Sequence, residues 1–106
     1  MEQLHGPSGP GSVVLDIGGD VGAAVVYAPA SLAGAEVEIR RRDTPWDGTH
    51  VAVRARQLPT GVTYAALFGA LAQGSYEVRV RHGEPDGPLA VFDVAGGTVS
   101  TVRLSR

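Results

Sequence analysis

The sequence contains no cysteine, no lysine and no asparagine. The absence of cysteine excludes disulfides, thiolate metal ligands and cysteine nucleophiles, and it leaves the redox state of the compartment open. All nine basic residues are arginines, and Ala, Gly and Val dominate, a bias that we attribute to a GC-rich coding sequence. Because the net charge of −2 lacks a basic excess, we predict no binding to nucleic acid.

Long apolar runs are also missing. No stretch has the length needed to span a bilayer, and residues 1–11 have neither the basic nor the apolar region of a signal peptide. We therefore expect a cytoplasmic protein that does not bind membranes. The length of 106 residues predicts one domain. Glycine and proline in residues 1–11 predict a flexible segment there, which leaves residues 12–106 as the folded domain.

What is present is a series of short β-branched and alternating stretches between glycine- and proline-rich turns. They predict strands at 12–17, 21–28, 35–42, 49–58, 62–68, 75–82, 89–94 and 98–104. The turns at 18–20, 59–61 and 96–97 predict three hairpins. One helical turn is expected in 29–34, where Leu32 would cap the core. The pattern predicts an all-β fold, a single antiparallel β-sandwich of seven to eight short strands.

Clean alternation predicts which side chains face water. In residues 35–42 it turns Val37 and Ile39 inward, and in residues 75–82 it turns Tyr76 and Val78 inward. The outward residues form three charged sets: Glu36, Glu38 and Arg40; Arg54 and Arg56 with His50; and Glu77, Arg79 and Arg81. We expect these sets to lie side by side on one wet sheet surface, joined by cross-strand ion pairs.

A family resemblance rests on residues 68–78, Phe-Gly-Ala-Leu-Ala-Gln-Gly-Ser-Tyr-Glu-Val. They resemble the Phe-x-x-Leu-x-x-Gly-x-Tyr-x-Val crossover of transthyretin-like (prealbumin-like) sandwich domains, which include carboxypeptidase regulatory domains and repeat modules of bacterial adhesins. Residues 95–104 are similar to the closing hairpin of such domains. The resemblance implies a crossover between two layers, with Phe68, Leu71 and Tyr76 in the core.

The resemblance also bears on activity. The hydroxyisourate hydrolases of this family end in Tyr-Arg-Gly-Ser, whereas this chain ends in Arg-Leu-Ser-Arg, which argues against that activity. The adhesin modules use a Lys–Asn isopeptide crosslink, which this composition excludes. The whole chain is also similar to small proteins of high-GC actinobacteria through Leu-Asp-Ile-Gly-Gly-Asp-Val-Gly-Ala and Thr-His-Val-Ala-Val-Arg, a likeness that implies no function.

Candidate contact residues gather around the turn at 43–48. Trp46 is either an exposed recognition residue or a cover over the end of the sandwich. His50 is either a ligand group with Asp47, Arg54 and Arg56 or a half-exposed histidine at the start of a strand.

Metal and cofactor signals are weak. The spacing of His5, His50 and His82 matches no metal-ligand pattern, so we predict no metal. Residues 18–22 are rich in glycine, but no helix follows them to form a phosphate site, and we predict no cofactor.

These observations favour a non-enzymatic accessory or protein-binding module, because no nucleophile–base pair or cofactor fingerprint is present. Its charged sheet face and the Trp46 turn would contact a protein partner or a second copy. The alternative is a small ligand-binding protein or hydrolase with a site near His50, Arg54 and Arg56 at an oligomer interface. A third interpretation is an edge-to-edge homodimer, because an open sandwich exposes edge strands.

Overall fold

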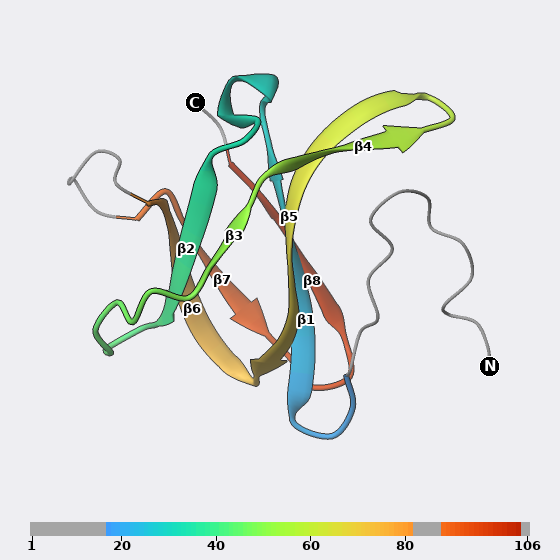
Figure 1. Ribbon diagram of the computed structural model, residues 1–106. Coiled ribbons are helices and arrows are strands. Elements are labelled where there is room, and N and C mark those ends of the chain that lie inside the picture. Colours follow the sequence, from blue (N-terminus) through green and yellow to red (C-terminus); the bar gives the residue numbers. More distant parts are fainter. Residues whose placement is uncertain (1–16, 82–87, 105–106) are drawn as a thin grey trace.

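The computed structural model describes residues 17–81 and 88–104, and these form two sheets that lie face to face (Figure 1). The strands are β1 (Val21–Ala28), β2 (Glu36–Arg41), β3 (His50–Ala52), β4 (Arg54–Leu58), β5 (Gly61–Ala72), β6 (Gly74–Val80), β7 (Ala90–Val94) and β8 (Val99–Arg103). One sheet has the order β4-β5-β1-β8 and the other β3-β2-β6-β7. The predicted all-β sandwich is confirmed.

Some predicted elements lie outside the described residues, namely the segment 1–11 and nearly all of the strand at 12–17. The only helical element of the described ranges is one 3-10 turn, η1 (Ala30–Leu32), and Leu32 is packed against the core as expected. In these ranges no helix has the length and apolar character that crossing a membrane requires.

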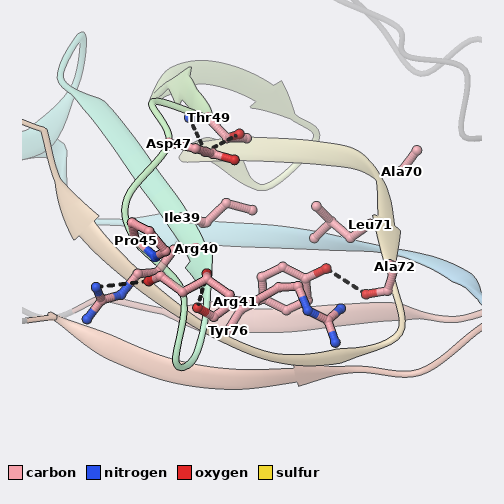
Figure 2. A pocket seen from close by; sticks show the side chains of 11 residues that line it. Ile39, Arg40, Arg41, Pro45, Asp47, Thr49, Ala70, Leu71, Ala72 and Tyr76 are labelled. Atoms are coloured by element: carbon pink, nitrogen blue, oxygen red, sulfur yellow. Dashed lines mark hydrogen bonds between the residues drawn. The ribbon is translucent and has the colours of Figure 1, made fainter.

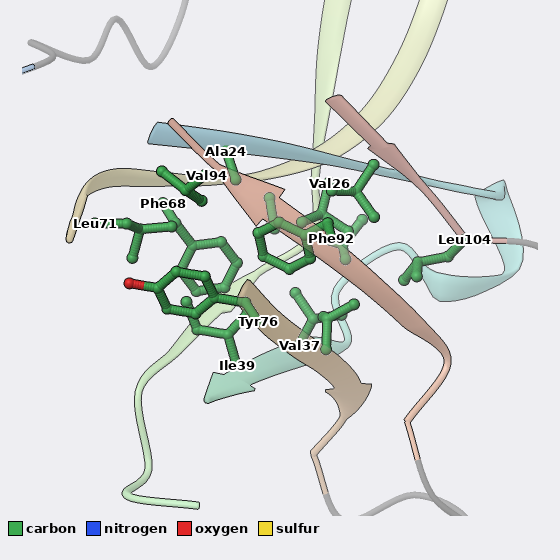
Figure 3. Close-up of a cluster of buried hydrophobic side chains, with 14 residues drawn as sticks. Ala24, Val26, Val37, Ile39, Phe68, Leu71, Tyr76, Phe92, Val94 and Leu104 are labelled. Atoms are coloured by element: carbon green, nitrogen blue, oxygen red, sulfur yellow. The ribbon is translucent and has the colours of Figure 1, made fainter. Parts of the chain in front are cut away.

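The core fills the space between the two sheets, and both sheets supply it (Figure 3). It comprises Ala24, Val26, Val37, Ile39, Val53, Ala66, Phe68, Leu71, Tyr76, Val78, Phe92, Val94, Val102 and Leu104. The rings of Tyr76 and Phe92 stack with centroids 5.6 Å apart. The Tyr76 hydroxyl donates to the Ala72 carbonyl at 2.6 Å, so its polar end is satisfied. The expected core positions Phe68, Leu71 and Tyr76 are confirmed.

The crossover between layers is also confirmed. β5 ends at Ala72 in one sheet and β6 begins at Gly74 in the other, with Gln73 alone between them. Gly74 has a φ of +154°, which an L-residue with a side chain rarely adopts. The Arg41 guanidinium lies against it and donates to the Gln73 carbonyl at 3.0 Å. A glycine is therefore needed where the chain changes sheets.

Two of the predicted tight turns are present. β4 and β5 pair from Arg54↔Ala65 to Leu58↔Gly61, which leaves a two-residue turn between the strands, as the predicted hairpin requires. Gly18 and Val21 exchange both backbone hydrogen bonds, at 2.8 and 2.9 Å, across the glycine turn that precedes β1. Local turn chemistry was therefore a reliable signal at both places.

The predicted single strand over residues 49–58 is wrong. The segment is divided at Val53, so that β3 pairs with β2 in one sheet and β4 pairs with β5 in the other. Val53 is 2 % exposed, and its backbone N–H donates to the Ala35 carbonyl at 2.8 Å. Alternation continues through this residue, which is why the sequence pattern did not indicate a change of sheet.

The predicted closing hairpin is wrong as well. β7 pairs with β6, whereas β8 crosses to the other sheet and pairs in parallel with β1. The glycine turn instead packs against the turn before β1. Gly97 N–H donates to the Val21 carbonyl at 2.9 Å, and a Cβ on Gly96 would overlap the Gly19 carbonyl oxygen. A pair of glycines is compatible with a hairpin within one sheet or with an arch that joins two sheets. Here residues 95–98 form an arch from β7 to β8.

We predict that Gly22→Ala destabilises the fold more than Gly97→Ala. A Cβ at position 22 would lie 2.7 Å from Val94 Cγ1 and even closer to the Ala95 carbonyl oxygen. The expected loss in free energy of unfolding is about 3 kcal/mol for this overpacking. Gly97 has a φ of +75° but open space around it, so its substitution should cost only ~1 kcal/mol. Urea denaturation measures both, and equal losses would contradict the prediction.

Candidate binding surfaces

The outer face of the β3-β2-β6-β7 sheet carries a ladder of ion pairs between β2 and β6. Arg40 Nη2 lies 2.8 Å from Glu77 Oε1, Arg79 Nε lies 3.0 Å from Glu38 Oε1, and Arg81 Nη1 lies 3.5 Å from Glu36 Oε1. The expected cross-strand pairing of these two charged sets is therefore present. Arg54 and Arg56 do not join them, because β4 belongs to the other sheet.

Glu38 is a buried carboxylate on this face, with 5 % of its surface exposed. Alternation had placed it in water. In the described residues its only salt-bridge partner is Arg79, whose side chain is 35 % exposed. Removing one partner of a desolvated pair leaves an uncompensated charge, so the pair contributes strongly to the local structure.

Trp46 folds back onto this ladder. The ring centroid lies 3.9 Å from Arg79 Cζ and 4.5 Å from Arg40 Cζ, and the indole is half-buried. Such cation–π contacts contribute about 0.5–2 kcal/mol each. Trp46 was predicted to be either an exposed recognition residue or a cover over the end of the sandwich. The structure agrees better with a covering role, but Trp46 covers the outer face of the sheet and not the end of the sandwich.

The loop of residues 43–49, which we call the Trp46 loop, is held by its own hydrogen bonds. Asp47 Oδ1 accepts from the Thr49 hydroxyl at 2.7 Å and from the Thr49 backbone N–H at 3.0 Å. The Thr44 hydroxyl donates to the Arg41 carbonyl at 2.7 Å, and Arg40 Nη1 donates to the Thr44 carbonyl at 3.1 Å. The Thr49 hydrogen bonds lower the pKa of the Asp47 carboxyl below its ordinary value.

His50 stands at the start of β3, with its ring exposed. Nδ1 lies 2.6 Å from the Gly48 carbonyl oxygen, and Arg81 Nη1 lies 2.8 Å from Nδ1 and 3.0 Å from Nε2. Glu36 Oε1 lies 3.8 Å from Nε2. The neighbours of His50 are thus on β2 and β6.

The structure brings only part of the predicted candidate set together. Trp46, Asp47 and His50 lie on or beside one loop at the β3 edge. Arg54 and Arg56 lie on β4, in the opposite sheet, because the strand is divided at Val53.

A groove that sequence reasoning missed opens between the Trp46 loop and the last residues of β5 (Figure 2). Its volume is about 490 Å³. The apolar floor consists of Ile39, Leu71 and Tyr76, which come from three different strands. The full lining is Ile39, Arg40, Arg41, Thr44, Pro45, Asp47, Thr49, Ala70, Leu71, Ala72 and Tyr76. No sequence signal marked the groove, because it depends on how far β5 extends beyond its pairing with β4.

The described residues contain no group of three or more His, Asp or Glu side chains that could hold a metal ion. The polar side chains around the groove are a carboxylate, hydroxyls and guanidinium groups: Asp47 accepts from the Thr49 hydroxyl, and Arg40 and Arg41 donate to backbone carbonyls. This arrangement suits recognition of a polar or extended ligand. Searches of protein-family models, curated proteins and solved structures returned no match to this chain.

We predict that Arg79→Met destabilises the protein by about 2–3 kcal/mol because it leaves Glu38 buried without its counter-charge. The double variant Glu38→Gln/Arg79→Met should recover most of this loss. Arg81→Met is the matched control, because Glu36 is half-exposed and an exposed pair contributes less than about 1 kcal/mol. Thermal denaturation of the parent protein and the three variants measures these losses. Equal costs for the two single variants would contradict the role given to Glu38.

We predict that Asp47 titrates below 3.8, its ordinary pKa, and that Thr49→Val raises this pKa toward that value. Since the folded-state pKa is depressed, the Asp47–Thr49 contribution to stability is present above pH 3.8 and is lost as pH falls through the folded pKa. A carboxyl-carbon NMR titration measures the midpoint. Thr44→Val, which removes a hydroxyl elsewhere in the loop, should leave it unchanged.

Proposed function

We propose that this chain is a non-enzymatic protein-binding β-sandwich that holds an extended peptide of a partner protein in the groove beside the Trp46 loop. The transthyretin-like affiliation and the cytoplasmic location inferred from the sequence belong to the same proposal. The edge of β5 is the observation that carries it.

β5 has an unpaired edge beside the groove. β4 pairs with β5 only from Gly61 to Ala65, whereas β1 pairs along the other edge as far as Ala72. Among the described residues, no strand pairs with residues 66–72 on the side away from β1; we call this side the open edge of β5. A strand edge presents backbone N–H and C=O groups that an added peptide strand can bind.

The groove offers side-chain recognition next to that edge. Its floor of Ile39, Leu71 and Tyr76 suits one apolar side chain of a bound peptide. The Asp47 carboxylate on the loop wall remains ionised well into the acidic range and would attract a basic residue of the peptide. We therefore commit to a peptide in which an apolar residue lies close to an arginine or lysine.

The enzymatic alternative has less support. It requires His50, Arg54 and Arg56 to act together, but these residues belong to different sheets of one protomer. His50 instead hydrogen-bonds Gly48 and Arg81. A site completed by a second protomer would need a new interface that joins both sheets.

The test selects binders from a phage-displayed random dodecapeptide library and maps one of them by amide chemical shifts. We expect shifts in residues 66–72 and in the Trp46 loop. Ala70→Trp, at an exposed position in the groove lining, should weaken binding about tenfold or more by steric exclusion. The matched control is Ala33→Trp, at an exposed alanine after η1, and it should bind as the parent protein does.

Two results would refute the proposed function. One is a selected peptide that binds Ala70→Trp with unchanged affinity or shifts residues away from the groove. The other is robust turnover on a panel of hydrolase substrates that disappears in His50→Ala.

A further inference from the structure

The β4-β5-β1-β8 sheet has an outer face that the core does not use. Ala24 and Val26 of β1 belong to the core, so alternation turns Ala23, Val25 and Tyr27 to the other side. The strand register places the neighbours of these residues on the same face. Val25 pairs with Leu67 of β5 and Thr101 of β8, Tyr27 with Ala65 and Arg103, and Ala23 with Val99.

This face is apolar along its centre. Ala23 and Ala65 are 0 % and 1 % exposed although neither belongs to the core cluster between the sheets. Val25, Tyr27 and Leu67 around them are half-buried. At the margins, Val99 on β8 is 42 % exposed and Leu58 on β4 is 45 % exposed. A contiguous apolar surface on a sheet is normally covered by another layer.

The charges on this face all have one sign. The four strands contain no Asp or Glu, and their charged residues are Arg54 and Arg56 on β4 and Arg103 on β8. Within the described residues no carboxylate forms a salt bridge with any of the three. The Arg103 guanidinium lies 4.8 Å from the centroid of the Tyr27 ring. The acidic residues of the described strands are on β2, β6 and β7, in the other sheet.

We propose that this face, defined by Val25, Tyr27 and Leu67 with arginines at both margins, binds an acidic amphipathic helix of a partner protein. Its apolar stripe would lie along β1 and β5, and carboxylates on its two flanks would pair with Arg54 or Arg56 and with Arg103. This surface is distinct from the groove, and the inference does not depend on the proposed function.

The dimensions fit a single helix. Strands in a sheet are about 4.8 Å apart, so β4 and β8, separated by β5 and β1, are roughly 14 Å apart. A helix with its side chains is about 10–12 Å wide, which places flanking glutamates within reach of both arginine margins. Ala23 and Ala65 are already covered by their neighbours, so the helix would contact Val25, Tyr27 and Leu67.

Other occupants fit the charges or the shape less well. A second copy placed face to face would bring arginine margins together without any carboxylate between them. An anionic membrane would attract the arginines, but Tyr27, the aromatic residue of this face, is half-buried beside the Arg103 guanidinium and does not protrude as an anchor for insertion. Charge and shape together favour the helix.

The test uses the whole chain and two synthetic 18-residue helical peptides with the same Leu and Ala stripe. One carries glutamates on both flanks of the stripe and the other carries lysines. Binding is measured by isothermal titration at low and at physiological salt. We expect the glutamate peptide to bind, to weaken as salt rises, and to lose about tenfold or more in affinity in Arg54→Glu/Arg103→Glu. The lysine peptide should gain affinity for that variant.

Matched variants separate this face from other surfaces. Arg42→Glu makes the same charge change as the single variant Arg54→Glu, at an exposed position before the Trp46 loop, and should leave binding unchanged. Ala70→Trp, which blocks the groove, should also leave it unchanged, so a failure here and a failure of the proposed function are distinguishable. Circular dichroism melting checks that each variant folds, and the single variant Arg54→Glu replaces the double variant if Arg103→Glu unfolds.

Three results would overturn the proposal. The first is equal binding of the two peptides, or no exchange of preference in the charge-reversed variant. The second is binding to phosphatidylserine vesicles alone, with no binding to the glutamate peptide. The third is a concentration-dependent dimer, seen by light scattering, that Leu67→Ser abolishes, because the face would then serve a second copy.

Discussion

β1 is paired on both edges along nearly its whole length, and this double pairing determines where the other strands can lie. β5 occupies one edge in antiparallel register from Val21↔Ala72 to Ala28↔Tyr64, and β8 occupies the other in parallel. A parallel partner cannot be reached by a tight turn, and here β8 follows β7 of the opposite sheet through the arch of residues 95–98. Gly22 lies against the arch that brings it there. The small side chains of β1 are therefore a packing requirement at its start.

Charge is divided between the two outer faces. On the β3-β2-β6-β7 sheet, three carboxylates and three guanidinium groups pair across β2 and β6. On the β4-β5-β1-β8 sheet the described strands carry arginines alone. The net charge of the protein is therefore a poor guide to either surface, because one face neutralises itself and the other keeps its positive sign.

Alternation predicted the faces of the strands because the period of two follows from backbone geometry. It placed Val37, Ile39, Tyr76 and Val78 in the core correctly. Alternation could not indicate which sheet a strand joins, because an inward residue such as Val53 gives the same apolar–polar pattern in either sheet. For that reason the division of residues 49–58 and the arch before β8 were not foreseen.

The candidate site was less predictable than the fold. The setting of Glu38 depends on Arg79 from a neighbouring strand, and the Trp46 ring lies over the guanidinium of that arginine from a loop. The groove depends on β5 extending past β4, which is a property of pairing and not of composition. Local chemistry did indicate the loop that borders the groove, because the only tryptophan stood among turn-forming residues.

The order of the Trp46 loop bears directly on how a ligand could bind beside it. A loop that is ordered only on binding would use part of the interaction energy to fix its backbone and side chains. Here Asp47, Thr49 and Thr44 already make their hydrogen bonds, and Trp46 already lies against two arginines. One wall of the groove is thus in place before any peptide arrives. The conformational entropy lost on binding would then come mainly from the peptide. Backbone hydrogen bonds to the open edge of β5 would compensate for this loss.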